Sequence, residues 1–216
     1  MRRLFKSEKT LFLACYLAFF LISAAACLYG FCEDRILRAA GKLEEFTLSA
    51  ADFDLVDLAP AEGQDTYIST STDPRMLLTR LPGKVRTVEL EIDFSGEPGE
   101  MTLFYMPKAG MEEFSPSYRV WAVKTGEGRY SFTLPRKDIY GLRIDPGMYN
   151  QNQMTFLSIR CNTKRPASAY FTVSSTWLFY FTVCPALIAS ALKYLIALYQ
   201  HFAGPRRQEL TGQHAD

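Results

Sequence analysis

Two long runs with almost no charge, one near each end of the chain, limit what this sequence can fold into. Residues 11–31 contain no Asp, Glu, Lys or Arg, and residues 176–199 contain only Lys193. At about 1.5 Å rise per residue, each run as a helix is long enough to cross the roughly 30 Å hydrocarbon core of a bilayer. Aromatic residues at both ends of the second run fit the interfacial belts, and Lys193 can snorkel to the headgroups. The sequence therefore predicts transmembrane helices at 10–32 and 176–199.

Basic residues in the short flanks predict the orientation of these helices, because positively charged flanks remain on the cytoplasmic side. Both tails, 1–9 and 200–216, are therefore expected in the cytoplasm. We therefore expect a multi-pass protein of the plasma (cytoplasmic) membrane, with residues 33–173 on the extracytoplasmic side. The residues that carry this prediction are Arg2, Arg3, Lys6 and Lys9 before the first run and Lys193, Arg206 and Arg207 at the end of the second run or after it.

The N-terminus also admits a second interpretation. Basic residues, an apolar run and the triplet Ala24-Ala25-Ala26 are together typical of a signal peptide with a small-residue cleavage site, and Cys27 follows directly. The apolar run continues through Phe31, beyond that site, which favours an uncleaved anchor. Under both interpretations the middle of the chain lies outside.

After a charged juxtamembrane linker at 33–45, the period of the sequence changes to that of β-strands. In residues 88–94, VELEIDF, apolar and acidic residues alternate strictly, as in a strand with one buried and one wet face. Short runs separated by Gly- and Pro-containing turns predict an all-β antiparallel sandwich, jelly-roll-like, over 46–173. Because this domain is flanked by the two transmembrane helices, we expect its ends to lie close together at its base. The other expected strands are 53–58, 66–70, 76–81, 101–106, 118–123, 129–134, 139–144, 154–160 and 169–173.

Composition excludes several kinds of chemistry from the outer domain. The chain has two histidines, His201 and His214, both in the C-terminal tail, so the domain can form neither a Ser-His-Asp arrangement nor a histidine-based metal site. Residues 33–173 contain 17 Lys and Arg against 20 Asp and Glu, which is not the basic excess of a nucleic-acid-binding protein. We therefore expect a protein that is not an enzyme, with no metal, no cofactor and no nucleic-acid partner.

Two alternatives remain open at this stage. Two carboxylates can hydrolyse a glycan, although most acidic residues of the domain occupy solvent-facing strand positions or turns. Cys32 and Cys161 can form a disulfide in an oxidising compartment or remain two unpaired thiols.

Three stretches in order, STDPRMLLTRLPG (71–83), MTLFYMPKAGMEEFSPSYRV (101–120) and YSFTLPRKDIYGLRIDPG (130–147), carry a resemblance. Together they resemble a β-sandwich module of bacterial integral-membrane proteins that assemble cell-surface polysaccharide, including membrane glycosyltransferases. The resemblance implies a non-catalytic accessory membrane subunit with a carbohydrate-binding-like sandwich. Its partner would be a membrane-embedded glycosyltransferase or polysaccharide flippase. The alternative is a free-standing, membrane-anchored, lectin-like protein.

Within these stretches, Asp73-Pro74 and Asp145-Pro146-Gly147 predict tight turns. In such turns the Asp carboxylate accepts hydrogen bonds from backbone N–H groups of its own turn, which pins the strand register.

Sugar-binding sandwiches combine an aromatic face with fork-like polar groups. Trp121 is the aromatic residue of most interest, and alternation in 120–123 leaves open whether it faces the core or solvent. The candidate ligand-binding residues are Trp121, Tyr105, Tyr118, Arg119, Arg143, Tyr149, Asn150 and Asn152.

Small residues in both predicted transmembrane helices would allow another helix to approach closely. Ala25 in the first and Ala189 in the second represent these positions. They either dock a partner protein or pack the two helices on each other.

Overall fold

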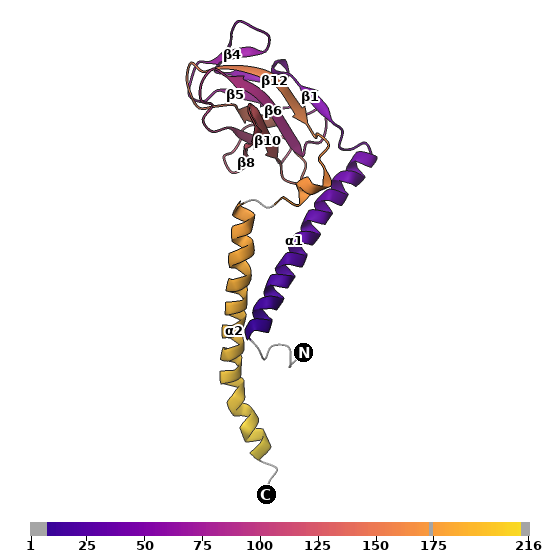
Figure 1. The fold of residues 1–216 in the computed structure, drawn as a ribbon, viewed down its shortest axis with the longest axis vertical. Helices are drawn as coiled ribbons and strands as arrows, with labels where there is room; N and C mark the ends of the chain where they lie inside the picture. The colour runs from indigo at the N-terminus through magenta and orange to yellow at the C-terminus, as the bar shows by residue number, and fades with distance from the viewer. Residues whose placement is uncertain (1–7, 173–174, 213–216) are drawn as a thin grey trace. The chain divides into compact units, whose positions relative to one another are not determined.

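The computed structural model describes residues 8–172 and 175–212, which form two compact units. The helical unit takes the chain up to Glu33 and again from Pro166, and the sandwich unit runs from Asp34 to Arg165. Figure 1 shows the elements of both units. Arg2, Arg3 and Lys6, which carried part of the orientation prediction, lie outside the described residues.

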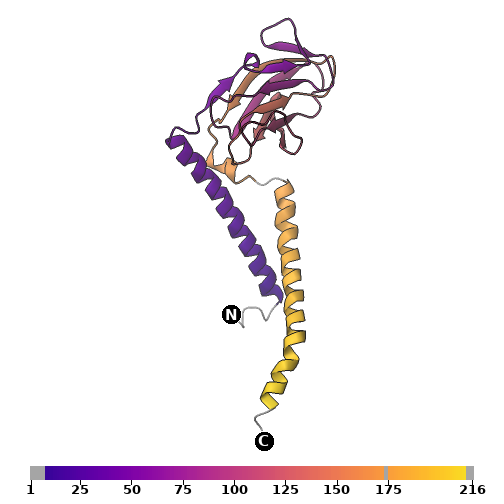
Figure 2. The ribbon, with the colours of Figure 1, turned by 180° about the vertical axis from the view of Figure 1, so that it is seen from behind.

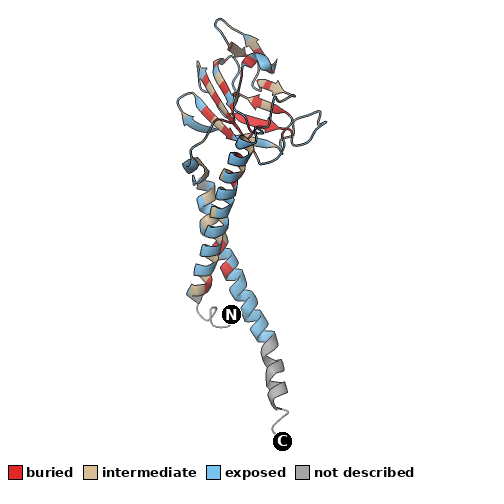
Figure 3. Ribbon diagram, turned by 90° about the vertical axis from the view of Figure 1, so that its right-hand side faces the viewer, coloured by how far each residue is buried: buried red, intermediate tan, exposed pale blue. Residues whose placement is uncertain are grey.

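The helical unit consists of two long helices and a short 3-10 turn. Helix α1 (Glu8–Ala39) begins in this unit and ends in the sandwich unit, whereas α2 (Ser175–Gly212) belongs to it entirely. Both helices are long and apolar enough to cross a membrane, with mean hydropathies of 2.4 and 1.8 over their most apolar windows. Figure 3 shows their surfaces largely exposed, as expected of apolar side chains that meet lipid.

The two helices pack antiparallel through aromatic and small residues. The Tyr16 hydroxyl donates a hydrogen bond to the Thr182 carbonyl (2.8 Å), and the rings of Phe19 and Phe181 meet edge to face at 5.6 Å. Ala189 is fully buried, whereas Ala25 is exposed. Of the two predicted docking positions, Ala189 is therefore used inside this chain.

Two antiparallel sheets form the sandwich unit, and Figure 2 shows them from behind. Within the described residues, the larger sheet has the order β3-β4-β12-β6-β10-β9, with β1 added beside β12, and the smaller has the order β2-β5-β11-β7-β8. The larger contains β1 (Phe46–Leu48), β3 (Leu58–Pro60), β4 (Thr66–Ser69), β6 (Thr87–Phe94), β9 (Val123–Gly126), β10 (Arg129–Thr133) and β12 (Gln153–Cys161). The smaller contains β2 (Asp54–Val56), β5 (Arg75–Leu78), β7 (Thr102–Tyr105), β8 (Arg119–Trp121) and β11 (Leu142–Asp145).

The core lies between the sheets and is built by strand alternation. In β6, Val88, Leu90 and Ile92 are buried while the acidic residues between them face outward, as the sequence predicted. Phe132 of β10 and Met76 of β5 are fully buried in the same core cluster. At about 25 cal/mol per Å² of apolar surface, this burial is the main favourable contribution to the fold.

Two expected strands are divided in the structure and a third is replaced by a helical turn, while the expected strands 76–81 and 139–144 are shorter, at Arg75–Leu78 and Leu142–Asp145. The segment 53–58 is divided at Asp57, whose positive φ of 58° ends β2 before β3 begins in the other sheet. The segment 118–123 is likewise divided, and the chain passes from one sheet to the other at Ala122. Instead of a strand at 169–173, a 3-10 helix, η2 (Ala167–Tyr170), follows Pro166. The last residue of that expected strand, Val173, lies outside the described residues.

The turn at 145–147 connects the sheets rather than two paired neighbours, since β11 and β12 belong to different sheets. Gly147 fits there because a Cβ would lie 2.8 Å from the Pro98 carbonyl oxygen. The crossover thus requires a glycine for close backbone approach.

The first and last strands of the sandwich, β1 and β12, pair with each other, which confirms that its ends lie together. Asn162 joins this end: its Nδ2 donates to the carbonyls of Glu44 (2.8 Å) and Lys84 (2.6 Å), and its Oδ1 accepts from the Arg86 backbone (2.8 Å). A φ of 59° at Asn162 suits asparagine better than most residues. Near the end of α1, Arg38 donates to the Asn162 carbonyl (2.5 Å), so this helix end is tied to the same point.

Candidate functional site

The solvent-facing side of the five-stranded sheet, called the outer face below, brings together three of the predicted ligand-binding residues: Trp121, Arg119 and Arg143. Alternation in β7 and β11 sends Leu103 and Ile144 into the core, so Phe104 and Arg143 point away from it. Strand pairing aligns the outward residues across the sheet. The outer face comprises Asp54, Val56, Arg75, Leu77, Arg143, Asp145, Thr102, Phe104, Arg119 and Trp121.

One row of this face runs across four strands. Leu77 lies opposite Arg143, which lies opposite Phe104, which lies opposite Arg119. The Arg143 guanidinium stacks over the Phe104 ring at 4.7 Å, so Phe104 is only 9% exposed although it faces outward. Cation and ring hold each other in position on the face.

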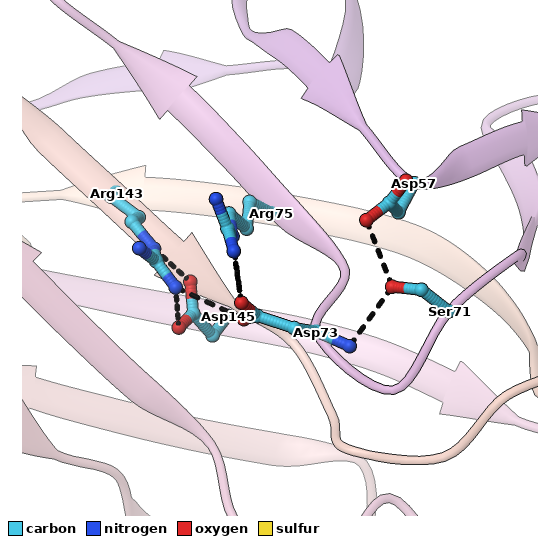
Figure 4. A network of polar contacts seen from close by, with 6 residues as sticks. All are labelled: Asp57, Ser71, Asp73, Arg75, Arg143 and Asp145. Carbon is cyan, nitrogen blue, oxygen red and sulfur yellow. Dashed lines mark hydrogen bonds and ion pairs between the residues drawn. The ribbon is translucent and has the colours of Figure 1, made fainter.

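An ion-pair network fixes the polar groups at the centre of the face (Figure 4). Arg143 donates from Nε and Nη2 to the two carboxylate oxygens of Asp145, at 2.6 and 2.7 Å. Its Nη2 also donates to Asp73 Oδ1 at 3.0 Å, and Arg75 donates to Asp73 Oδ2 from Nε at 2.9 Å and from Nη2. Charge-assisted, bidentate contacts of this kind are both strong and directional.

The sequence predicted that the Asp73 and Asp145 carboxylates accept hydrogen bonds from backbone N–H groups of their own turns, and this prediction is wrong. Their carboxylates accept from arginine side chains of β5 and β11 rather than from backbone N–H groups of their own turns. Instead, the Asp73 backbone N–H donates to the Ser71 hydroxyl (3.0 Å), which donates to the Asp57 carboxylate (2.9 Å). Through Ser71, Asp57 thus holds the loop in which Asp73 lies close to Arg75 and Arg143.

Burial and the ion pairs act in opposite directions on the acidity of Asp145. Burial has the larger effect and raises its pKa above the ordinary value, while the Arg143 hydrogen bonds lower it. For Arg75, the hydrogen bond to Asp73 raises the pKa, so this guanidinium remains charged.

Trp121 and Arg119 lie at the β8 edge of the outer face and are both exposed. The indole is 50% exposed, and the Arg119 guanidinium lies over the ring, 4.8 Å from its centre. A core position for Trp121, one of the two alternatives left by the sequence, is wrong because Val120 and Ala122 supply the inward side of this segment. The edge therefore combines an open aromatic surface with an adjacent cation.

Tyr105 and Tyr118 do not join this face. Tyr105 is 8% exposed and belongs to the core cluster, and its ring lies 5.8 Å from that of Tyr118, which packs against the core. Lys137 Nζ lies 5.0 and 5.1 Å from the two ring centres. None of the three belongs to the ion-pair network.

The remaining candidates lie in the crossover between β11 and β12. Asn152 is buried and structural: its Nδ2 donates to the Glu97 carbonyl (3.1 Å) and its Oδ1 accepts from Ser95 (3.3 Å). Asn150 is exposed and accepts the Gln151 backbone N–H (2.9 Å). Tyr149 is 52% exposed, so it is available for contact, but it is not one of the outer-face residues.

Trp121, Arg119 and Arg143, which the sequence predicted as ligand-binding residues, share the outer face, whereas the sequence did not predict the stacking of Phe104 or the pairing of Arg75 with Asp73. The outward position of Phe104 could have been predicted, because alternation in 101–106 points its side chain to the other side of the strand from Leu103 and Tyr105. The pairing with Asp73 required the loop conformation and was invisible along the chain.

Other reactive groups lie away from this face. Cys161 is a free thiol buried in the sandwich core, where burial raises its pKa to about 12, and Cys32 is also free. Among the residues that the structure describes, no group of three or more His, Cys, Asp and Glu is placed to hold a metal ion.

Comparison with known proteins finds similarity in solved structures only. No family model and no curated protein matches the chain. The low-affinity xylan-binding module CBM86 from Roseburia intestinalis is 14% identical with a TM-score of 0.39, covering 57% of this chain and 98% of that module. The β-1,3-glucan-binding CBM6 from Bacillus halodurans is 12% identical with a TM-score of 0.32, covering 53% and 96%. CsCBM6-3 from Clostridium stercorarium, solved with cellobiose, is 9% identical with a TM-score of 0.30, covering 51% and 92%. Values this low do not transfer a function, so the role of the outer face is derived from its own geometry.

Proposed function

We propose that this protein is a membrane-anchored glycan-binding module whose outer face holds the sugar chain. The observation that carries this proposal is the open Trp121 indole at the end of a face whose polar groups are held in place by ion pairs. The two apolar helices would anchor the module, with both termini in the cytoplasm and the sandwich outside the plasma membrane.

The chemistry of the face suits a sugar chain in two ways. An aromatic ring buries the apolar C–H surface of a sugar ring, and rigid polar groups fix the direction of its hydroxyls. Because Arg143 and Asp145 already hold each other, they lose little freedom when a ligand binds. From β2 to β8 there are four strand spacings, roughly 19 Å in all, which favours an oligosaccharide over a single sugar.

A binding role is supported over hydrolysis by the state of the two carboxylates. Both Asp145 oxygens and both Asp73 oxygens accept guanidinium hydrogen bonds. A glycosidase needs one carboxyl group free to give a proton and another free to act on the sugar or on water. We therefore propose a non-catalytic module.

The proposal is tested on the full-length protein in lipid nanodiscs by calorimetry against a panel of cell-envelope oligosaccharides. We expect dissociation constants between millimolar and micromolar, and we expect Trp121→Ala to weaken binding at least tenfold, which is about 1.4 kcal/mol. Tyr140→Ala is the matched control, since Tyr140 is also an exposed aromatic (44%) but is not an outer-face residue. The proposal fails if no oligosaccharide binds, or if both variants lose binding equally.

We further propose that the helix pair attaches this module to a membrane enzyme of polysaccharide assembly, a glycosyltransferase or flippase. The exposed Ala25 supports this, because a small residue facing away from the helix pair leaves room for another helix.

Gentle-detergent purification of tagged full-length protein from its native membrane tests this attachment. We expect Ala25→Leu to reduce recovery of the partner, while Ala197→Leu, at an exposed position on α2, should not. Unchanged recovery with Ala25→Leu, or recovery of the protein alone, would leave a free-standing binding module.

A further inference from the structure

We propose that the glycan carries carboxylate groups, as in a uronic-acid-containing polysaccharide, and that Arg119 binds one of them. This inference rests on the proposed glycan-binding function of the outer face. It adds the chemical class of the sugar and the residue that selects it.

The charge distribution of the outer face singles out Arg119. Arg75 is bonded to Asp73, and Arg143 to Asp145 and Asp73, so these four charges compensate one another. Among the residues that the structure describes, Arg119 forms no ion pair, and its interaction is with the Trp121 ring. The β8 edge therefore keeps one uncompensated positive charge.

The position of Arg119 leaves its charge accessible to a ligand. Arg119 is exposed on the edge strand of its sheet, opposite Phe104, so no further strand of the described chain covers it. Asp54, on the opposite edge strand β2, is exposed as well, which gives the face a positive and a negative end. An acidic chain would bind with a carboxylate at the β8 edge, away from Asp54.

Shape favours a carboxylate on a sugar ring over an isolated anion. The Arg119 guanidinium lies over the Trp121 ring, 4.8 Å from the ring centre, so a sugar ring would stack beside it on the remaining open indole surface and turn a carboxylate substituent towards it. The planar guanidinium fork matches the two oxygens of a carboxylate. Neutral sugars offer hydroxyls, which form weaker bonds to the same group.

The experiment compares an oligouronate with its carboxyl-reduced, neutral counterpart, each titrated into the full-length protein in zwitterionic nanodiscs. We expect the oligouronate to bind roughly tenfold more tightly at low salt. We expect this preference to shrink at about 1 M salt, where exposed charges are screened, while the neutral chain is little affected.

Variants separate the inference from the proposed function. Arg119→Gln should abolish the preference by weakening the oligouronate more than the neutral chain, whereas Trp121→Ala should weaken both ligands by a similar factor. Arg129→Gln, an exposed arginine on the larger sheet, is the matched control and should keep the preference. Near-ultraviolet circular dichroism confirms that each variant is folded.

Equal affinity for the two chains in the unmodified protein, with loss of both in Trp121→Ala, would overturn the acidic-glycan inference and leave glycan binding standing. A preference that survives Arg119→Gln would also overturn it, since another group would then recognise the carboxylate. Binding of neither chain, nor of any glycan in the wider panel, would overturn both proposals.

Discussion

Replacing Arg143 with methionine tests whether the ion-pair network holds the outer face together. Methionine keeps an unbranched stem over Phe104 but removes three hydrogen bonds, two to Asp145 (2.6 and 2.7 Å) and one to Asp73 (3.0 Å). Removing one partner of a buried ion pair costs about 3–5 kcal/mol. The side chains of Arg143 and Asp145 are 17% and 14% exposed, so we expect a cost at or just below the lower limit, about 2–3 kcal/mol.

The pH dependence of this cost follows from Asp145. Its pKa in the folded protein is already raised by burial, and removing Arg143 removes the main contribution that lowers it. A carboxyl group with a raised folded pKa binds its proton more tightly in the folded state, so its destabilising effect appears as pH rises and disappears as pH falls. The cost of Arg143→Met should therefore be largest at neutral pH and shrink as pH falls towards the ordinary aspartate pKa.

Urea-dependent pulse proteolysis of full-length protein in nanodiscs measures this cost, because the protease cleaves the sandwich when it unfolds. Arg160→Met is the control: Arg160 is 46% exposed and lies 3.8 Å from Glu89, so its loss should cost under about 1 kcal/mol. In the double variant Arg143→Met with Asp145→Asn, the total should fall short of the sum by about 1 kcal/mol or more. A cost of Arg143→Met equal to that of the control, or one independent of pH, would refute the reasoning.

Two further predictions concern the base and the core of the sandwich. Asn162→Ala removes three hydrogen bonds that join the chain near Glu44, Lys84 and Arg86, and we expect a loss of about 2–3 kcal/mol in the same assay; a loss below about 0.5 kcal/mol would contradict this role. Because burial raises the pKa of Cys161 to about 12, its thiol should resist maleimide at pH 8 in the folded protein and react in urea, as read by peptide mass mapping. Rapid labelling without urea would show that this part of the core opens.

The sequence by itself determined those features of the protein that depend only on residues close together along the chain. Uncharged runs of sufficient length required apolar helices, and strict alternation at 88–94 required a strand with one buried face, which became β6. Both follow because hydrogen bonding and burial repeat with a short period inside one element. The sandwich unit, Asp34 to Arg165, contains no histidine, so a Ser-His-Asp arrangement cannot be built from its residues.

Only the tertiary structure decided which faces are wet and which charges meet. Alternation around Trp121 defines two faces, but burial of one of them depends on the sheet that β8 joins and on the change of sheet at Ala122. The carboxylates of Asp73 and Asp145 meet at Arg143 from positions 70 and 2 residues away along the chain. Long-range strand register and loop path create that meeting, and no local pattern encodes them. The candidate site therefore depends on sheet pairing, whereas the two long apolar helices and the alternating strand β6 can be predicted from the residues alone.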